Sequence, residues 1–137
     1  MSILLVDDED RLRRTIARSL SARGYGVVEA GSCRQAVEAA STDQFDLMLL
    51  DINLPDATGW DVLRVLGERG HSLPTIVFSA VPPSAVRVRE FRPFGVLKKP
   101  FPIDALLQVV RRVEQEQAAA NGAVPPTSLL HVESGRP

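Results

Sequence analysis

Hydrophobic residues along the chain alternate between short uninterrupted runs and longer segments with helical spacing. The runs lie within residues 3–6, 27–28, 45–50, 75–78 and 95–97, of which 45–50 is broken by Asp46. Such runs are typical of strands that are buried on both faces. Between the runs, apolar residues recur three or four positions apart, as on one face of a helix. The pattern therefore predicts strands and helices in regular alternation.

Strands separated by helices predict right-handed crossovers and a parallel sheet that is covered on both sides. Five strands and up to five helices fit an α/β flavodoxin-like, doubly wound sheet with strand order 2-1-3-4-5. Pro82, Pro83 and Pro93 interrupt the segment before the fifth strand. Since proline cannot continue a helix past its first turn, we expect the fourth helix to be short, distorted or missing.

The last apolar series, from Ile103 to Val113, predicts a helix, and beyond about Gln117 no period is sustained. We therefore expect one domain over residues 1–116. Residues 117–137 are expected to form a flexible tail or the start of a linker.

Composition excludes several classes of protein but does not indicate a function. The chain has 137 residues, with 16 Lys+Arg against 17 Asp+Glu and a net charge of −1, which gives no reason to expect binding to nucleic acid or to a membrane. One cysteine, Cys33, excludes an internal disulfide. No apolar run is long enough for a membrane span and no signal peptide is visible, so we expect a cytoplasmic location.

Reactive side chains follow four of the expected strands, at the ends where ligands bind in open parallel sheets. These residues are Asp7, Asp8, Asp51, Ser79 and Lys99. Crowded carboxylates favour a cation, and Mg²⁺ is commonly held by one or two carboxylates with water and phosphate oxygens. An Asp beside a metal and a Lys is a plausible nucleophile toward phosphorus. Each residue alone has a simpler explanation, but together they predict Mg²⁺-dependent phosphoryl transfer to an Asp.

Four segments in this order resemble the receiver domain of bacterial two-component response regulators. They are ILLVDDE at 3–9, DLMLLDINLPDATG at 46–59, FSA at 78–80 and KPF at 99–101. The resemblance covers about residues 3–115. In that family the aspartate that ends the third strand accepts a phosphoryl group from a sensor kinase histidine. The resemblance therefore implies that Asp51 is the phosphoacceptor.

The same resemblance implies roles for the remaining residues. Asp8 and Asp51 would bind Mg²⁺ directly, Asn53 would add its main-chain carbonyl, and Asp7 would act through water. Ser79 and Lys99 would engage the phosphoryl group. The peptide bond between Lys99 and Pro100 is expected to be cis, as is common in the family.

Val96 departs from the family pattern, because many receivers have a Tyr or Phe at this position. That ring moves inward when the Ser or Thr of the fourth strand approaches the phosphate, and valine has no ring to move. We therefore expect coupling that is weak, or that is routed through the proline-rich loop after Ser79.

The favoured function is a phosphorylatable signalling switch that turns over no outside substrate and so is not an enzyme in the usual sense. Its expected partners are a sensor histidine kinase or phosphotransfer protein and an unknown downstream protein target. The chain itself is expected to be a monomer or weak homodimer.

Three alternatives remain. One is a degenerate receiver that acts as a constitutive interaction module. Another is an aspartate-nucleophile phosphohydrolase, which would need a second acid where Asn53 stands. The last is a flavodoxin-like cofactor binder, but the acidic loop after the first strand would repel phosphate.

Overall fold

The structure, a computed structural model, describes residues 1–121. Most of the expected tail, residues 122–137, lies outside this part. Within the described residues, ten elements alternate: β1 (Ser2–Val6), α1 (Asp10–Ser21), β2 (Gly26–Ala30), α2 (Cys33–Thr42), β3 (Leu47–Asp51), α3 (Gly59–Glu68), β4 (Thr75–Ser79), α4 (Ala85–Phe91), β5 (Gly95–Lys98) and α5 (Ile103–Asn121).

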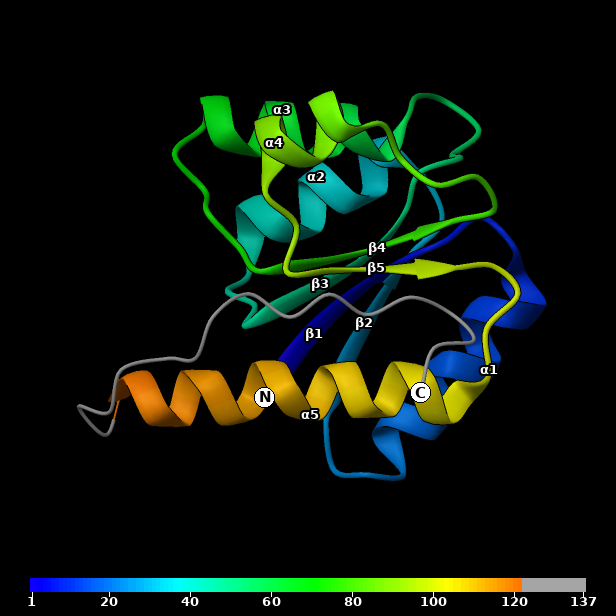
Figure 1. Cartoon of the computed structure of the whole chain (residues 1–137), viewed down its shortest axis with the longest axis vertical. Helices are drawn as coiled ribbons and strands as arrows, with labels where there is room; N and C mark the ends of the chain where they lie inside the picture. Colours follow the sequence, from blue (N-terminus) through cyan, green and yellow to red (C-terminus); the bar gives the residue numbers. More distant parts are fainter. Residues whose placement is uncertain (122–137) are drawn as a thin grey trace.

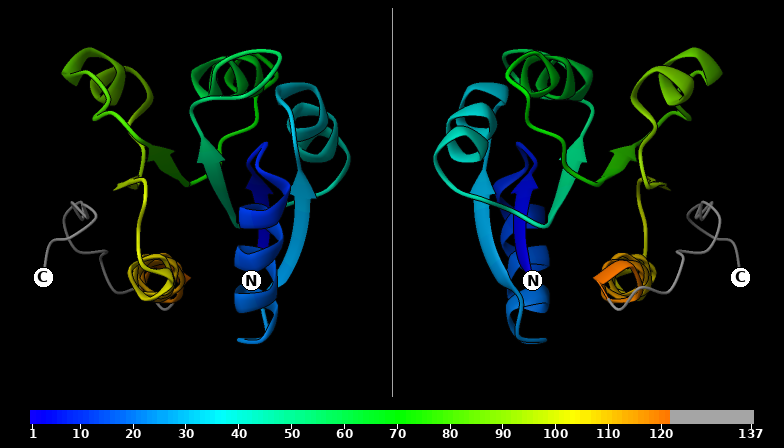
Figure 2. Two further views of the ribbon diagram at one scale, coloured as in Figure 1. Left: turned by 90° about the vertical axis from the view of Figure 1, so that its right-hand side faces the viewer. Right: turned by 90° about the vertical axis from the view of Figure 1, so that its left-hand side faces the viewer.

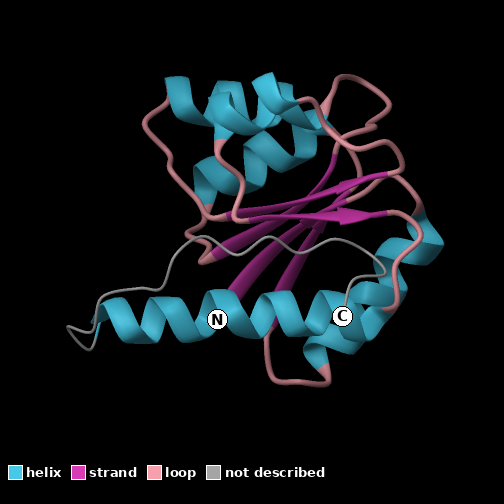
Figure 3. Cartoon of the chain, viewed as in Figure 1, coloured by secondary structure: helices cyan, strands magenta, loops and turns pink. Residues whose placement is uncertain are grey.

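The five strands form one parallel sheet in the order β2-β1-β3-β4-β5. Helices α1 and α5 lie on one side of this sheet, and α2, α3 and α4 lie on the other (Figures 1 and 2). The helical and strand layers are also distinct in Figure 3. The predicted flavodoxin-like fold and strand order are confirmed.

Alternation along β1 divides the interior into two cores. Ile3 and Leu5 pack with residues of α1 and α5, whereas Leu4 and Val6 pack with residues of α2 and α3. All four side chains are fully buried. This double burial explains why the strands lack the apolar–polar alternation of a sheet with one solvated face.

The strand register brings the expected site residues to one edge. Val6 pairs with Leu50, so Asp7 and Asp51 each follow a residue of the same pair. On the other side of β3, Asp51 pairs with Phe78, and Ser79 pairs with Lys98. The polar ends of β1, β3, β4 and β5 therefore meet at the carboxyl edge of the sheet.

Helix α4 has seven residues, none of them buried, which confirms the expectation of a short fourth helix. It ends at Arg92, which adopts a left-handed conformation with φ of 48°, directly before Pro93. Proline disfavours helical geometry in the residue that precedes it, and this accounts for the stop.

Helix α5 continues to Asn121, beyond the position where the apolar period ends. Ala118, Ala119 and Ala120 have the highest helix propensity of any residue type and extend the helix without an apolar stripe. The Gln117 side chain also donates a hydrogen bond of 2.8 Å to the Asp46 carbonyl. Among residues 1–121, no helix is long and apolar enough to cross a membrane.

Leu106 tests the contribution of α5 to the core, because its side chain is fully buried against the sheet. We expect Leu106→Ala to lower the free energy of unfolding by about 2–5 kcal/mol through lost burial and a residual cavity. Urea denaturation followed by circular dichroism would measure the change. The exposed neighbour Gln108 is the control, and Gln108→Ala should shift stability by less than about 0.5 kcal/mol. Equal effects of the two variants would contradict this packing.

Candidate functional site

Three carboxylates and one ammonium meet at the carboxyl edge of the sheet. Ligand oxygens of Asp7, Asp8 and Asp51 lie within 4.8 Å of one another. The Lys99 Nζ donates to Asp7 Oδ2 at 2.8 Å and to Asp51 Oδ2 at 3.1 Å. Asp7 and Asp51 are buried and Asp8 is exposed. The structure therefore brings together four of the predicted residues in one cluster.

Burial and charge act against each other at these groups. Burial raises the pKa of Asp51, as does the charge of Asp7, while the Asn53 N–H and Lys99 oppose the rise. For Lys99, burial disfavours the charged form, but hydrogen bonds and charge from Asp7 and Asp51 outweigh it and raise the pKa. One ammonium faces three carboxylates, so ionised acids leave an excess of negative charge that suits a divalent cation.

The loop after β3 fixes the position of Asp51. The Asn53 N–H donates to Asp51 Oδ1 at 3.1 Å, and the Gly59 N–H donates to the Ile52 carbonyl at 2.7 Å. A Cβ on Gly59 would lie 2.6 Å from the Asp51 carbonyl oxygen. Only glycine permits this approach, so the first residue of α3 packs directly on the backbone of Asp51.

Ser79 lies at the same edge, and its hydroxyl is engaged with the loop that follows β4. The hydroxyl donates to the Val81 carbonyl and accepts from the Val81 N–H at 3.2 Å. The Lys99 N–H donates to the Ser79 carbonyl at 2.9 Å, which ties the two strand ends together. The peptide bond between Lys99 and Pro100 is cis, as expected.

Several residues that shape the pocket were not assigned a role from the sequence. Glu9 Oε1 is 3.5 Å from the Lys99 Nζ, and the Arg13 guanidinium donates to the Asp7 carbonyl at 2.8 Å. The Asp56 carboxylate accepts hydrogen bonds from the Cys33 and Arg34 N–H groups, so it joins the loop after β3 to the start of α2. These contacts span separate elements, and no local sequence signal indicates them.

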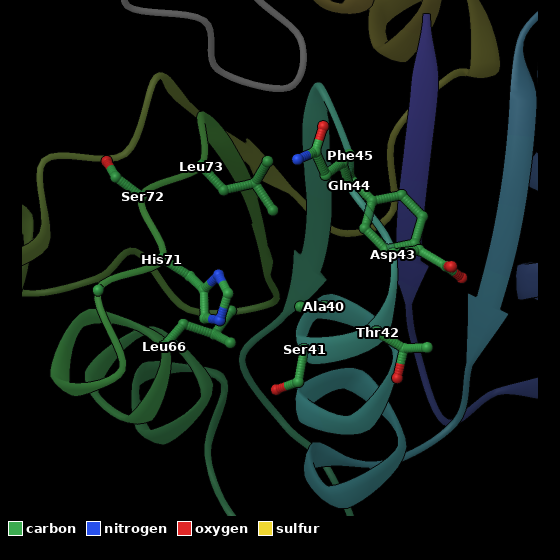
Figure 4. Close-up of a pocket in the computed structure, with 11 residues that line it drawn as sticks. Ala40, Ser41, Thr42, Asp43, Gln44, Phe45, Leu66, His71, Ser72 and Leu73 are labelled. Carbon is green, nitrogen blue, oxygen red and sulfur yellow. The ribbon is translucent and has the colours of Figure 1, made fainter.

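A separate hollow of about 470 Å³ lies near the opposite edge of the sheet. It is lined by the end of α2, the segment that leads into β3, and the segment from Gly70 to Leu73 before β4 (Figure 4). These segments precede their strands, whereas the carboxylate pocket follows them. The hollow therefore does not contribute to the site at Asp51.

A parallel α/β sheet with clustered acids and a lysine at its carboxyl edge is the arrangement that the resemblance to receiver domains implies. The family model for the response regulator receiver domain matches residues 3–111. The chain therefore belongs to the response regulator receiver domain family. The general function of the family is that of a phosphorylation switch in two-component signalling, not that of a classical enzyme, and phosphorylation on an aspartate is characteristic of it.

Curated relatives and solved structures agree with this assignment. The chain is 34% identical over 113 residues to the probable transcriptional regulatory protein SilR of Salmonella typhimurium, covering 81% of this chain and 50% of SilR. It is 34% identical over 135 residues to the response regulator MprA of Mycobacterium leprae, covering 94% of this chain and 59% of MprA. The chain thus spans about half the length of these relatives.

Among solved structures, the fold is similar to that of the chemotaxis response regulator CheY4 of Vibrio cholerae. The TM-score is 0.76 at 26% identity, over 82% of this chain and 97% of CheY4.

The close contact at Gly59 predicts a sharp difference between two glycines of α3. Gly59→Ala should lower the free energy of unfolding by about 1–3 kcal/mol, because the Cβ meets backbone that cannot easily move. Gly67 is the matched control, since a Cβ there meets nothing within 4 Å. Gly67→Ala should raise stability by about 0.5–1 kcal/mol, the cost of glycine inside a helix. Thermal unfolding of both variants measures the contrast, and a neutral Gly59→Ala would contradict it.

Proposed function

We propose that Asp51 is the phosphoacceptor of this receiver and that its phosphorylation requires Mg²⁺. The observation that carries the proposal is the Lys99 ammonium, which is hydrogen bonded to both Asp7 and Asp51 beside the exposed Asp8. This arrangement supplies a nucleophilic carboxylate, positive charge and a further acid within one pocket.

In the proposed reaction, an Asp51 carboxylate oxygen attacks phosphorus and forms a P–O bond. The P–N bond to the histidine of the donor breaks, and the imidazole leaves with the electron pair and takes up a proton. Lys99 is placed to meet negative charge on the transferred group, and the Ser79 hydroxyl can donate a hydrogen bond to it once released from Val81.

The donor set fits Mg²⁺, which prefers carboxylate and carbonyl oxygens. Asp8 and Asp51 would bind it directly, the main-chain carbonyl of Asn53 would add a ligand, and Asp7 would act through water. The bound ion would supply positive charge that offsets both the acids and the phosphoryl oxygens.

The proposed phosphoryl donor is a sensor histidine kinase or a phosphotransfer protein, in the cytoplasm. The signal would then pass to a downstream protein by direct contact, with the chain acting as a monomer or weak homodimer. Direct binding to nucleic acid or to a membrane is not part of the proposal, since the net charge of −1 gives no reason to expect it.

Incubation with acetyl phosphate and Mg²⁺, followed by intact-protein mass spectrometry, tests this proposal. We expect the gain of one phosphoryl group, and we expect Asp51→Asn or chelation of the metal to abolish it. The control is Asp43→Asn, an exposed acid at the end of α2 that should leave the adduct unchanged.

The pattern of outcomes separates the proposal from its rivals. No adduct on the parental chain would favour a constitutive interaction module. An adduct that survives Asp51→Asn would place the acceptor elsewhere.

A further inference from the structure

Helix α4 is weakly attached to the rest of the domain. Its seven residues include none that is buried, and only Val88 and Phe91 are half-buried. Val86 on the same helix is 62% exposed. Isolated helices of this length are unstable in water, so α4 depends on the few contacts that it makes outside itself.

One of these contacts is an aromatic stack at the end of α4. The rings of Phe91 and Trp60 have centroids 5.4 Å apart and planes inclined by 17°. Trp60 belongs to the first turn of α3 and is buried, with 7% exposure. Figure 1 shows α3 and α4 next to each other on the same side of the sheet.

Trp60 is in turn fixed by the phosphoacceptor loop. It directly follows Gly59, which packs on the Asp51 backbone and donates to the Ile52 carbonyl at 2.7 Å. The platform on which Phe91 rests is therefore continuous with the backbone of Asp51.

The start of α4 is joined to Ser79 by a stiff segment. The Ser79 hydroxyl is hydrogen bonded to Val81, and Pro82 and Pro83 follow with restricted backbone angles. Ser84 then caps α4 by accepting from the Arg87 N–H at 3.2 Å. A shift at Val81 can therefore reach the helix, because two of the three residues between Val81 and α4 have a φ angle fixed by proline.

Phosphorylation creates competition for one proton. A serine hydroxyl has a single O–H donor, so Ser79 cannot donate to the Val81 carbonyl and to a phosphoryl oxygen at once. If Ser79 turns to the phosphoryl group, the Val81 carbonyl must find another partner, and the loop between Val81 and α4 has to rearrange.

We propose that the stack of Phe91 on Trp60 holds α4 in its resting position and thereby opposes the release of Ser79 from Val81. Trp60 and Phe91 are then positioning residues that set how readily the pocket accepts a phosphoryl group. This inference rests on the proposed role of Asp51. It also supplies a coupling element in a chain whose Val96 lacks the aromatic ring that many receivers use.

Thermodynamic linkage predicts whether loss of the stack raises or lowers the affinity of the site for a phosphoryl mimic. A contact made in the resting state and lost in the occupied state lowers the affinity for whatever occupies the pocket, and its removal raises that affinity. The interaction energy of an aromatic pair corresponds to a change of about two- to tenfold in a binding constant.

The test is the Phe91→Ala variant of the full chain, with beryllofluoride and Mg²⁺ as the phosphoryl mimic. Without the mimic, amide exchange over residues 85–91 should be faster than in the parental chain, although alanine favours helix more than phenylalanine does. With the mimic, affinity should rise by about two- to tenfold. Trp60 is the one tryptophan of the chain, so its fluorescence reports the binding directly.

Two further variants separate the stack from a general effect on α4. Val86→Ala also raises the helix propensity of α4, but it leaves the stack intact. Amide exchange over residues 85–91 should therefore not become faster, and the affinity for beryllofluoride should not change. Phe91→Tyr keeps an aromatic ring and should restore parental behaviour in both measurements.

The outcomes are distinguishable. Faster exchange in Phe91→Ala with unchanged affinity would show that the stack stabilises α4 but is not coupled to the pocket, which overturns the inference while leaving Asp51 as the acceptor. Unchanged exchange would overturn it at the first step. Failure of the parental chain to bind the mimic or to accept phosphate from acetyl phosphate would overturn the proposed function, and the inference with it.

Discussion

The pair of hydrogen bonds from Lys99 to Asp7 and Asp51 is the constraint on which the site depends. Two buried carboxylates at neighbouring strand ends repel each other, and one ammonium reached from β5 offsets that repulsion. The ammonium can take this place only because β1, β3 and β5 end at the same edge of the sheet. The fold thus makes an otherwise unfavourable cluster of acids tolerable, and the cluster is compatible with a metal site.

The alternation of strands and helices could be predicted from the sequence because the sheet is buried on both faces, which leaves unbroken apolar runs such as that ending at Val6. The site could be predicted for a related reason: strand ends in a parallel sheet converge, so Asp7, Asp51 and Lys99 had to lie near one another. Contacts that single side chains make between separate elements could not be predicted from the sequence. Neither the bond from Arg13 to the Asp7 carbonyl nor that from Ser79 to Val81 leaves a periodic pattern in the sequence.

The proline-rich loop and α4 show one feature that the sequence predicts and one that it does not. Pro93 sets where the helix stops, and its effect on the preceding backbone is local and general. The partner of Phe91 is Trp60, more than thirty positions earlier, and that pairing depends on how α3 and α4 lie on the sheet. Trp60 is buried, with 7% exposure. Only the assembled fold identifies what it packs against.

The bond from Gln117 to the Asp46 carbonyl fixes where α5 stands relative to the sheet. The helix begins shortly after Lys99 and runs back past the first residues of β3, so its far end lies at the edge away from Asp51 (Figure 1). Nineteen helical residues span about 28 Å. Any influence passed between the site and the far end of α5 must therefore travel as a displacement of the whole helix, since no side chain at that end can reach Asp51.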